Sequence, residues 1–295
     1  MFRALVIAWR NCMNMDEKRD MQMKFLIALT VAAPLIFAAV GCGGNNEIYL
    51  TEERLDNGLV IVLPGIEGVS PFNRDIRKGL KNAGVYKGLP IHSWGRPIPI
   101  AGVLLNQMDF IGNRLAGQKI AQLIVDYQDS HPGRPVHIVG HSGGGGVAVF
   151  AAEAMPEGRK IDGLILLSAS ISHKYDLTKA LGHCRNGIVN FYNPKDTGLL
   201  SVGTTLVGNV DGAHGPSSGL SGFEKPSDDS DLQMANSSLY QVHVTDRMTG
   251  GGDAHMGTTK ASFVVKYVAP WVTRSPWPPG VGGFTRGVKQ TLSAR

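Results

Sequence analysis

The hydrophobic positions of this chain form short apolar runs that alternate with longer stretches of helical spacing. The runs are rich in Val, Ile and Leu and stop at Gly, Pro, Asn or Ser, which is typical of buried strands. The expected strands are residues 59–63, 91–94, 135–139, 161–167, 187–192 and 240–244, and the expected helices are residues 72–83, 110–127, 146–154, 172–183 and 258–271. Such alternation predicts an α/β fold, with a mostly parallel sheet and helices on both of its faces.

The first 42 residues have the pattern of a targeting segment. Lys24 precedes an apolar run over residues 25–40, which is too short and too interrupted by Pro34 for a membrane span. Ala39-Val40-Gly41-Cys42 resembles the lipobox of bacterial lipoproteins, although Ala39 stands where Leu is usual. The resemblance implies an exported protein, periplasmic or at the cell surface, that is anchored to a membrane by lipidated Cys42. Ordinary cleavage, which would give a secreted soluble protein, and an uncleaved anchor are the alternatives.

Four methionines, at positions 13, 15, 21 and 23, crowd just before this segment. Because a signal peptide normally lies at the extreme N-terminus, we expect translation to begin at one of them and the residues before it to be a mis-assigned start. Residues 43–46 are expected to form a tether, residues 47–273 the folded domain, and residues 274–295, rich in Pro and Gly, a disordered tail. Cys184 is then the single thiol of the domain, expected to be buried and inert.

Charge and composition describe an ordinary globular domain. Hydrophobic residues make up 43% and charged residues 18% of the 295 positions, and the net charge is +5. Residues 1–42 carry +2 and residues 274–295 carry +4, which leaves −1 on the domain between them. A near-neutral domain gives no electrostatic support for binding nucleic acid.

One motif concentrates the candidate chemistry. Gly140-His141-Ser142-Gly143-Gly144 follows a β-branched run, precedes small apolar residues and fits G-x-S-x-G. This is the pattern of a strand, a sharp turn and a buried helix, with a serine exposed on the turn and glycines that let strand and helix approach closely. Ser142 is therefore the candidate nucleophile. We expect the two further glycines, Gly145 and Gly146, to serve close packing of the helix against the sheet.

Three other interpretations of the glycine run compete. It could be only a tight connection. A Walker loop requires Lys and then Ser or Thr after its last glycine, where Val147 and Ala148 stand. A dinucleotide-binding loop, matched by Gly143, Gly145 and Ala148, requires an acidic residue at the end of the next strand, where Ser168 stands.

These residues resemble the α/β-hydrolase family over roughly residues 47–273. The resemblance depends on the motif around Ser142, on the strand end Leu63-Pro64-Gly65-Ile66-Glu67-Gly68 and on the order Ser, Asp, His along the chain. Family members carry the acid after a later strand and the histidine after the last one, which Asp196 and His255 match. The resemblance implies a Ser142-His255-Asp196 triad and little or no cap domain.

The triad chemistry requires these residue types. A serine hydroxyl is a weak nucleophile unless a neutral imidazole takes its proton, and a buried carboxylate must orient that imidazole and stabilise its charged form. Asp196 could instead be only a turn residue, and Asp176 and Asp211 are the reserve acids. His214 is the reserve base, while His141, beside the nucleophile, is expected to line the pocket.

The oxyanion formed during acyl transfer requires backbone donors. The N–H of Gly143 is one, and by family resemblance the N–H of Ile66 is the second, although Pro64 stands where many members have His. Trp94 is a second pocket candidate, and residues 197–238, rich in Gly, Ser and Asp, are expected to help select the substrate. No spacing of Cys, His and carboxylates resembles a metal site, and the chemistry needs no cofactor.

The sequence thus predicts a serine hydrolase that cleaves a carboxylic ester or a related acyl bond of a small-molecule or lipid-like substrate. Amide or thioester cleavage and acyl transfer would use the same residues. The alternative is a non-catalytic, membrane-anchored lipoprotein that uses the hydrolase fold as a binding module. The sequence does not indicate an oligomeric state.

Overall fold

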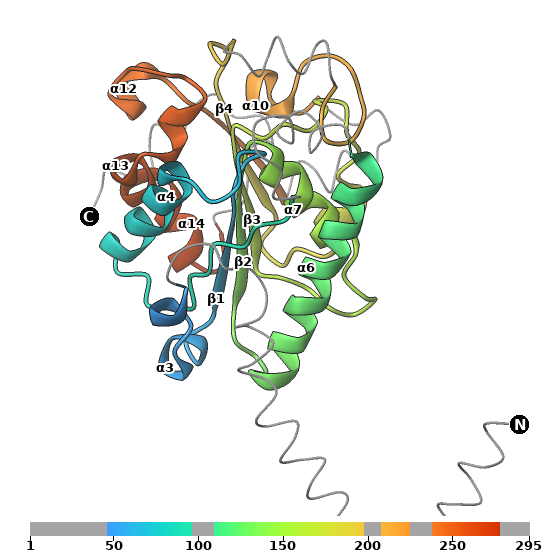
Figure 1. Ribbon diagram of the computed structural model, residues 1–295, viewed down its shortest axis with the longest axis vertical. Helices are drawn as coiled ribbons and strands as arrows, with labels where there is room; N and C mark the ends of the chain where they lie inside the picture. Colours follow the sequence, from blue (N-terminus) through green and yellow to red (C-terminus); the bar gives the residue numbers. More distant parts are fainter. Residues whose placement is uncertain (1–45, 96–108, 198–207, 225–237, 278–295) are drawn as a thin grey trace, which may run out of the picture. The chain divides into compact units, whose positions relative to one another are not determined.

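Five parallel strands form the sheet of the computed structural model, which describes residues 46–95, 109–197, 208–224 and 238–277 (Figure 1). Their order across the sheet follows the chain: β1 (Leu59–Leu63), β2 (Val136–His141), β3 (Gly163–Leu167), β4 (Ile188–Tyr192) and β5 (Leu239–His243). Every residue of β1, β2 and β3 is buried, which explains why these strands are continuous apolar runs rather than alternating patterns. The expected α/β class is confirmed.

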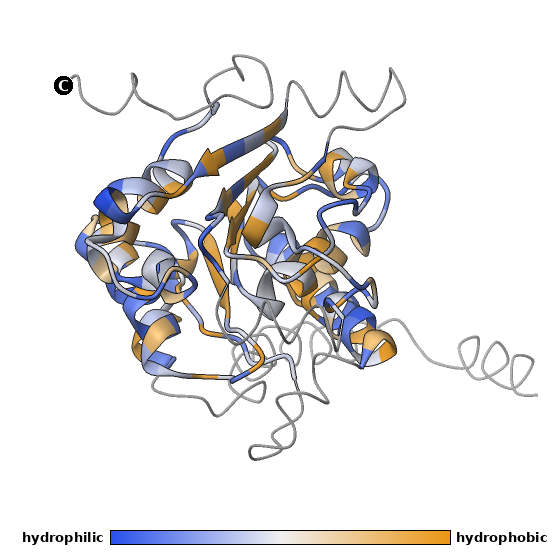
Figure 2. Cartoon of the chain, turned by 90° about the horizontal axis from the view of Figure 1, so that it is seen from above, coloured by the Kyte–Doolittle hydropathy of each residue, from blue (hydrophilic) through white to orange (hydrophobic). Residues whose placement is uncertain are grey.

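Helices cover both faces of the sheet, and the strands between them are largely hydrophobic (Figures 1 and 2). One face carries α4 (Pro71–Asn82), α13 (Ala261–Phe263), the π-helical turn η3 (Val264–Val268) and α14 (Ala269–Thr273), and the other carries α6 (Phe110–Ser130) and α7 (Gly143–Glu153). The remaining short elements are η1 (Glu47–Tyr49), α3 (Glu52–Leu55), α8 (Thr178–Gly182), α10 (Ser218–Ser221), α12 (Asp246–Thr249) and η2 (Met256–Thr259).

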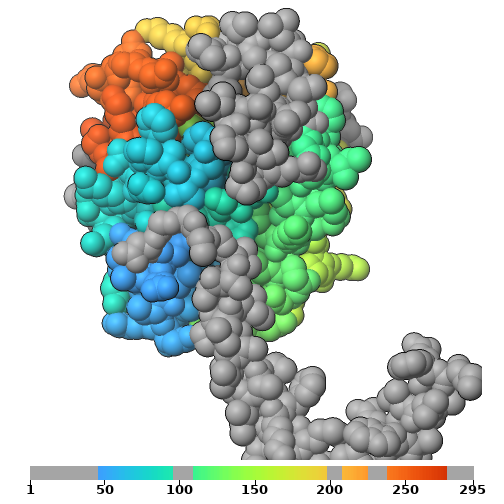
Figure 3. Space-filling model, in the orientation of Figure 1, coloured from blue at the N-terminus to red at the C-terminus, as the bar shows by residue number. Residues whose placement is uncertain are grey.

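The helices lie unusually close to their neighbours at two glycines. A Cβ atom on Gly79 of α4 would lie 2.6 Å from Cβ of Val264, and one on Gly117 of α6 would lie 2.7 Å from Cβ of Phe150 in α7. On the surface, α4 and the segment that follows β5 lie side by side (Figure 3). Close approach lets each helix pair bury its apolar side against the sheet.

The strand expected at residues 91–94 is replaced by a pairing of residues 88–92, a few positions earlier in the sequence. Residues 88–92 run parallel to β1 on the side away from β2, where Val60 N–H donates to the Gly88 carbonyl (2.8 Å) and His92 N–H donates to the Val62 carbonyl (2.9 Å). The segment remains a pair of bridges rather than a full strand because Pro90, in its middle, has no N–H to donate.

Two expected helices are shorter or broken. Of residues 172–183, only Thr178–Gly182 is helical, since Asp176 accepts the Thr178 N–H (2.8 Å) and Asp211 accepts the Ser172 N–H (3.2 Å), which holds the preceding residues in a loop. The expected helix over 258–271 is divided into η2, α13, η3 and α14. Pro270 supplies no N–H and crowds the preceding turn, which explains the π-helical turn before it.

The packed part of the chain extends beyond the expected domain of residues 47–273 at both ends. Asn46, expected in the tether, accepts hydrogen bonds from Arg77 (2.8 Å) and the Ile91 N–H (3.2 Å) and donates one to the Ile91 carbonyl (3.1 Å). The expected tail boundary at 273 shifts to 277 or beyond, because Trp277 is 4% exposed and packs on Trp271 and Tyr240. The expected signal segment, Cys42 and the rest of the tail lie outside the described residues. No helix in the described ranges is long and apolar enough to cross a membrane.

Candidate active site

The connections around β1 run in opposite directions at the carboxyl end of the sheet. After β1 the chain passes through α4 to residues 88–92 on one side of that strand, and α6 then returns it to β2 on the other side. The loops after β1 and β2 therefore lead away from one another, which is the switch point where parallel sheets of this kind bind ligands. Ile66 follows β1 and Ser142 follows β2, so both lie at this point of the sheet.

Ser142 occupies a strained backbone conformation between β2 and α7. Its φ of 53° and ψ of −125° lie where L-residues rarely occur, at a cost on the order of 1 to 3 kcal/mol. Two glycines make the turn possible: a Cβ on Gly140 would lie 2.5 Å from the Gly144 carbonyl oxygen, and one on Gly144 would lie 2.5 Å from that of Leu63. The expected sharp turn is present, and α7 begins at Gly143, three residues earlier than predicted.

The two further glycines of the run also have close neighbours. A Cβ on Gly145 would lie 2.5 Å from Cβ of Ala169, just after β3, and one on Gly146 would collide with Cγ2 of Val210. The expectation of close helix packing is confirmed, but the contacts are with these segments after the sheet rather than with the strands themselves. All four glycines at the start of α7 are thus required by close approach, which offsets their low helix propensity.

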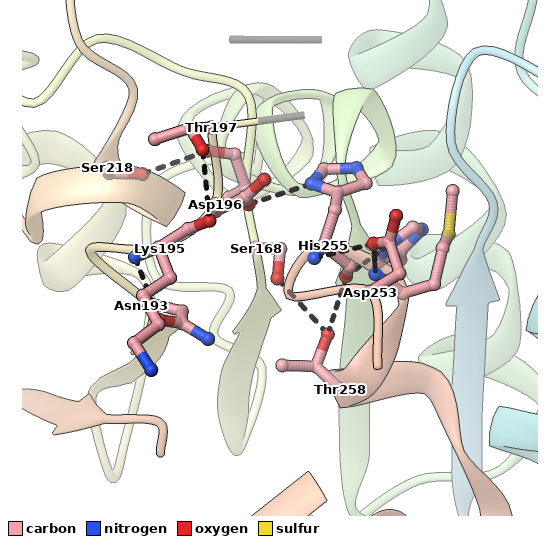
Figure 4. Close-up of polar contacts among 12 residues, drawn as sticks. Ser168, Asn193, Lys195, Asp196, Thr197, Ser218, Asp253, His255 and Thr258 are labelled. Atoms are coloured by element: carbon pink, nitrogen blue, oxygen red, sulfur yellow. Dashed lines mark hydrogen bonds and ion pairs between the residues drawn. The ribbon is translucent and has the colours of Figure 1, made fainter. Parts of the chain in front are cut away.

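Asp196 and His255 lie side by side although 59 positions separate them in the sequence. Asp196 Oδ2 is 2.8 Å from His255 Nδ1, and the two residues are only 5% and 7% exposed (Figure 4). They come from the loops after β4 and β5, which are adjacent strands. Because a carboxylate only accepts hydrogen bonds, Nδ1 is the protonated nitrogen and Nε2 keeps its lone pair.

Two buried polar atoms remain available. Ser142 Oγ and His255 Nε2 are both inaccessible to solvent, and neither has a hydrogen-bond partner in the part of the chain that the structure describes. Unsatisfied buried polar groups are uncommon in folded proteins and need an explanation. An unprotonated imidazole nitrogen and a hydroxyl held in this state are the two atoms that a serine nucleophile and its base would use.

His141 joins the two parts of the site. Its ring centroid lies 4.9 Å from that of His255, and its Nε2 is 3.4 Å from the His255 carbonyl oxygen. Burial, together with the neighbouring His255, lowers the pKa of His141 to about 3, so the ring is neutral at ordinary pH. His141 therefore packs against His255, and Ser142 is the next residue along the chain.

The loop after β1 and the start of α7 converge beside Ser142. A Cβ on Gly143 would lie 2.8 Å from Cγ2 of Ile66 and 3.2 Å from Cζ2 of Trp94. The Trp94 indole is held there by a hydrogen bond from Nε1 to the Pro64 carbonyl oxygen (2.7 Å). The N-terminus of α7, an eleven-residue helix, adds a favourable field for negative charge at this point. Gly143, Ile66 and Trp94 thus lie close together, and their expected roles as oxyanion donors and pocket residue stay predictions.

The loop that carries His255 has supports that the sequence analysis missed. Asp253 Oδ1 accepts the N–H groups of His255 and Met256, each at 2.8 Å, and Thr258 Oγ1 lies 3.2 Å from Ser168 Oγ and 3.4 Å from the His255 carbonyl oxygen (Figure 4). An Asp two residues before a histidine is a local signal for such a turn. Nothing local marks Thr258 or Ser168, because their contact joins residues 90 positions apart.

The reserve candidates have other roles. Asp176 is exposed and caps α8, and Asp211 accepts the Ser172 N–H. His214 is exposed. Residues 198–207 and 225–237 of the expected substrate-selecting segment lie outside the described ranges.

Burial leaves Cys184 a poor nucleophile, since it raises the pKa of the thiol to about 12. Across the described ranges, no group of three or more His, Cys, Asp or Glu side chains is placed to hold a metal ion.

No protein-family model matches the chain, and no curated protein matches its sequence.

Proposed function

We propose that this chain is a serine hydrolase of the α/β-hydrolase fold that cleaves a carboxylic ester, or a closely related acyl bond, of a small-molecule or lipid-like substrate. The observation that carries the proposal is the 2.8 Å pair of Asp196 Oδ2 and His255 Nδ1, together with the buried and unpartnered His255 Nε2 and Ser142 Oγ, the latter on a strained turn. The parallel sheet, with residues 88–92 on the far side of β1, supports the fold.

In the first half of the proposed reaction, Ser142 Oγ attacks the substrate carbonyl carbon while its proton passes to His255 Nε2. The carbonyl π electrons move onto oxygen and give a tetrahedral oxyanion. Asp196 stabilises the imidazolium that forms and keeps the ring in its orientation. When the intermediate collapses, the bond to the leaving oxygen breaks, that oxygen takes the proton from Nε2, and the alcohol departs from an acyl-Ser142 ester.

In the second half, water attacks the acyl carbon and gives a proton to His255 Nε2. Collapse of this second intermediate breaks the bond to Ser142 Oγ, which recovers the proton from Nε2, and the carboxylic acid leaves. No atom is left over, and no co-reactant other than water is used.

Stabilisation of the oxyanion is assigned to the backbone N–H groups of Gly143 and Ile66. The closeness of the two residues supports the assignment, since Cγ2 of Ile66 lies where a side chain on Gly143 would begin. Each such donor contributes about 3 to 4 kcal/mol to lowering the barrier in comparable sites. The helix N-terminus at Gly143 acts in the same direction.

A fluorophosphonate probe tests this function directly. We expect covalent labelling of the wild-type chain on Ser142, and none of Ser142→Ala, with intact mass and peptide mapping as the readout. A folded wild-type chain that is not labelled would contradict the proposal and favour the alternative, a non-catalytic binding module. A screen of 4-nitrophenyl esters of increasing acyl length then identifies the preferred acyl group.

The proposed location is outside the cytoplasm, at a membrane, through lipid on Cys42. This proposal comes from the lipobox resemblance alone. Incorporation of radiolabelled palmitate into the wild-type chain and its loss in Cys42→Ser is the expected result. Equal incorporation into both would exclude Cys42 as the lipidation site.

A further inference from the structure

The carboxylate of Glu67 lies next to the nucleophile, and the proposed reaction does not use it. Glu67 belongs to the loop after β1, directly after Ile66. Its carboxylate folds back over Gly65: a Cβ on Gly65 would meet Oε2 of Glu67, with the carboxyl carbon at 3.1 Å and Cβ of Ser142 at 3.2 Å. The carboxyl group of Glu67 and the side chain of Ser142 are therefore at most about 6 Å apart.

The position is electrostatically unusual. An acid beside the oxyanion site opposes the negative charge that forms in the transition state. Burial raises the pKa of Glu67, and its hydrogen bonds and the nearby His255 oppose that shift, while the residue as a whole is exposed at the surface. No Lys or Arg in the described ranges forms an ion pair with Glu67. Among the described side chains, only the titratable His255 offers this carboxylate a positive charge, and no permanently charged group does.

We propose that Glu67 selects acyl substrates that carry a cationic group, such as a quaternary ammonium, within a few bonds of the scissile carbonyl. This inference rests on the proposed hydrolase function, because it concerns the same site. A substrate cation near Glu67 supplies the missing positive charge and offsets the repulsion between the carboxylate and the oxyanion.

A purely local role for Glu67 predicts something different. Ser70 Oγ donates to Glu67 Oε1 (3.2 Å) at the N-terminus of α4, where Ser70 and Asn73 also form a capping box. If the carboxylate served only this helix end, its loss would lower the stability of the protein. It would then change the reaction with cationic and uncharged substrates to the same extent. A change in the preference for the cationic substrate therefore indicates substrate selection, whereas a change in stability alone indicates helix capping.

The experiment measures the bimolecular rate constant for labelling of Ser142 by two organophosphonates that differ in one group, trimethylammonium in the first and uncharged tert-butyl in the second. We expect the cationic probe to be favoured, and the ratio of the two rate constants to fall about tenfold in Glu67→Gln, the effect of a partly screened charge pair roughly 6 Å apart. Glu157→Gln, an exposed acid on another loop, should leave the ratio unchanged. The same double comparison with betaine ethyl ester and ethyl 3,3-dimethylbutanoate extends the test to turnover.

The outcomes are distinguishable. Labelling of Ser142 by both probes, with the same ratio in wild type and Glu67→Gln, overturns the charge selection and leaves the hydrolase function standing. No labelling by either probe contradicts the hydrolase function and the selection with it. Should Glu67→Gln fail to fold, the wild-type ratio decides the matter: it must decline as ionic strength rises, and a ratio that salt does not change overturns the proposal.

Discussion

The indole of Trp277 lies against Gly163 at the start of β3, so closely that a Cβ on Gly163 would lie 2.7 Å from Cη2 of the ring. Its Nε1 donates to the Trp271 carbonyl (2.8 Å). Trp277→Ala should lower the free energy of unfolding by about 3 to 5 kcal/mol, the usual cost of removing a buried large aromatic. Urea denaturation measures the loss. Val265→Ala, which truncates a 38% exposed side chain, should cost less than about 1 kcal/mol, and equal losses would contradict the role given to Trp277.

His137 in β2 has both ring nitrogens buried and without a partner among the described residues, and burial lowers its pKa from 6.5 to about 3. The unfolded chain therefore binds a proton on this imidazole below about pH 6.5 while the folded chain does not, so the folded state loses stability as the pH falls. His137→Leu should make the decline between pH 6 and pH 4 shallower by about 1.4 kcal/mol per pH unit. Denaturation curves at several pH values test this, and identical slopes would contradict it. Burial also lowers the pKa of His141 to about 3, and this residue keeps its own contribution to the pH dependence of stability in the variant.

Asp196→Asn should lower kcat on the screened ester on the order of 10⁴-fold, because an amide no longer holds the imidazole in the productive tautomer. Asp176→Asn removes an exposed carboxylate that caps α8 and is the matched control, with activity expected to stay near the wild-type level. Steady-state kinetics on both variants, with thermal melts to verify folding, gives the answer. Full activity in Asp196→Asn would exclude this residue as the acid.

Gly144→Ala should abolish labelling of Ser142 and cost about 1 to 3 kcal/mol of stability, since the new Cβ would collide with the carbonyl oxygens of Leu63 and Pro64. Gly182→Ala at the end of α8 is the control: no described atom lies within 4 Å of its added Cβ, so the change should be neutral or stabilising by up to about 1 kcal/mol. Probe labelling and thermal melts are measured on both. A labelled, stable Gly144→Ala would show that the turn does not need glycine there.

Local pattern predicted the sheet because the strands are buried on both faces, so that β1 is five apolar residues in a row. Pattern failed where a single side chain decides the structure. Pro270 divides the last helix, and Asp176 starts α8 later than its apolar spacing indicates. Trp277 stands in a stretch of Pro and Gly that is typical of a disordered tail, yet two aromatic neighbours, Tyr240 and Trp271, pack against it and it is buried.

The candidate site also contains residues that local pattern predicts and residues that it does not. Asp196 and His255 could be chosen from the sequence because each follows a strand, and their side chains do meet; their catalytic roles stay predictions. Glu67 and Thr258 could not be chosen, because their importance depends on how loops fold back over Gly65 and His255. Such contacts join residues that no sequence period links.

The order of the site residues along the chain also has a consequence for when the protein can react. Ser142, Asp196 and His255 follow β2, β4 and β5, so the proposed base is the last of the three to leave a ribosome or a secretion channel. Among the described strands β5 pairs with β4 alone, so His255 reaches Asp196 only once β5 has joined β4. A nascent chain carries the serine without an imidazole to take its proton. On the proposed function, the enzyme stays silent during synthesis and transport and acquires its activity only in the compartment where the final strand is added.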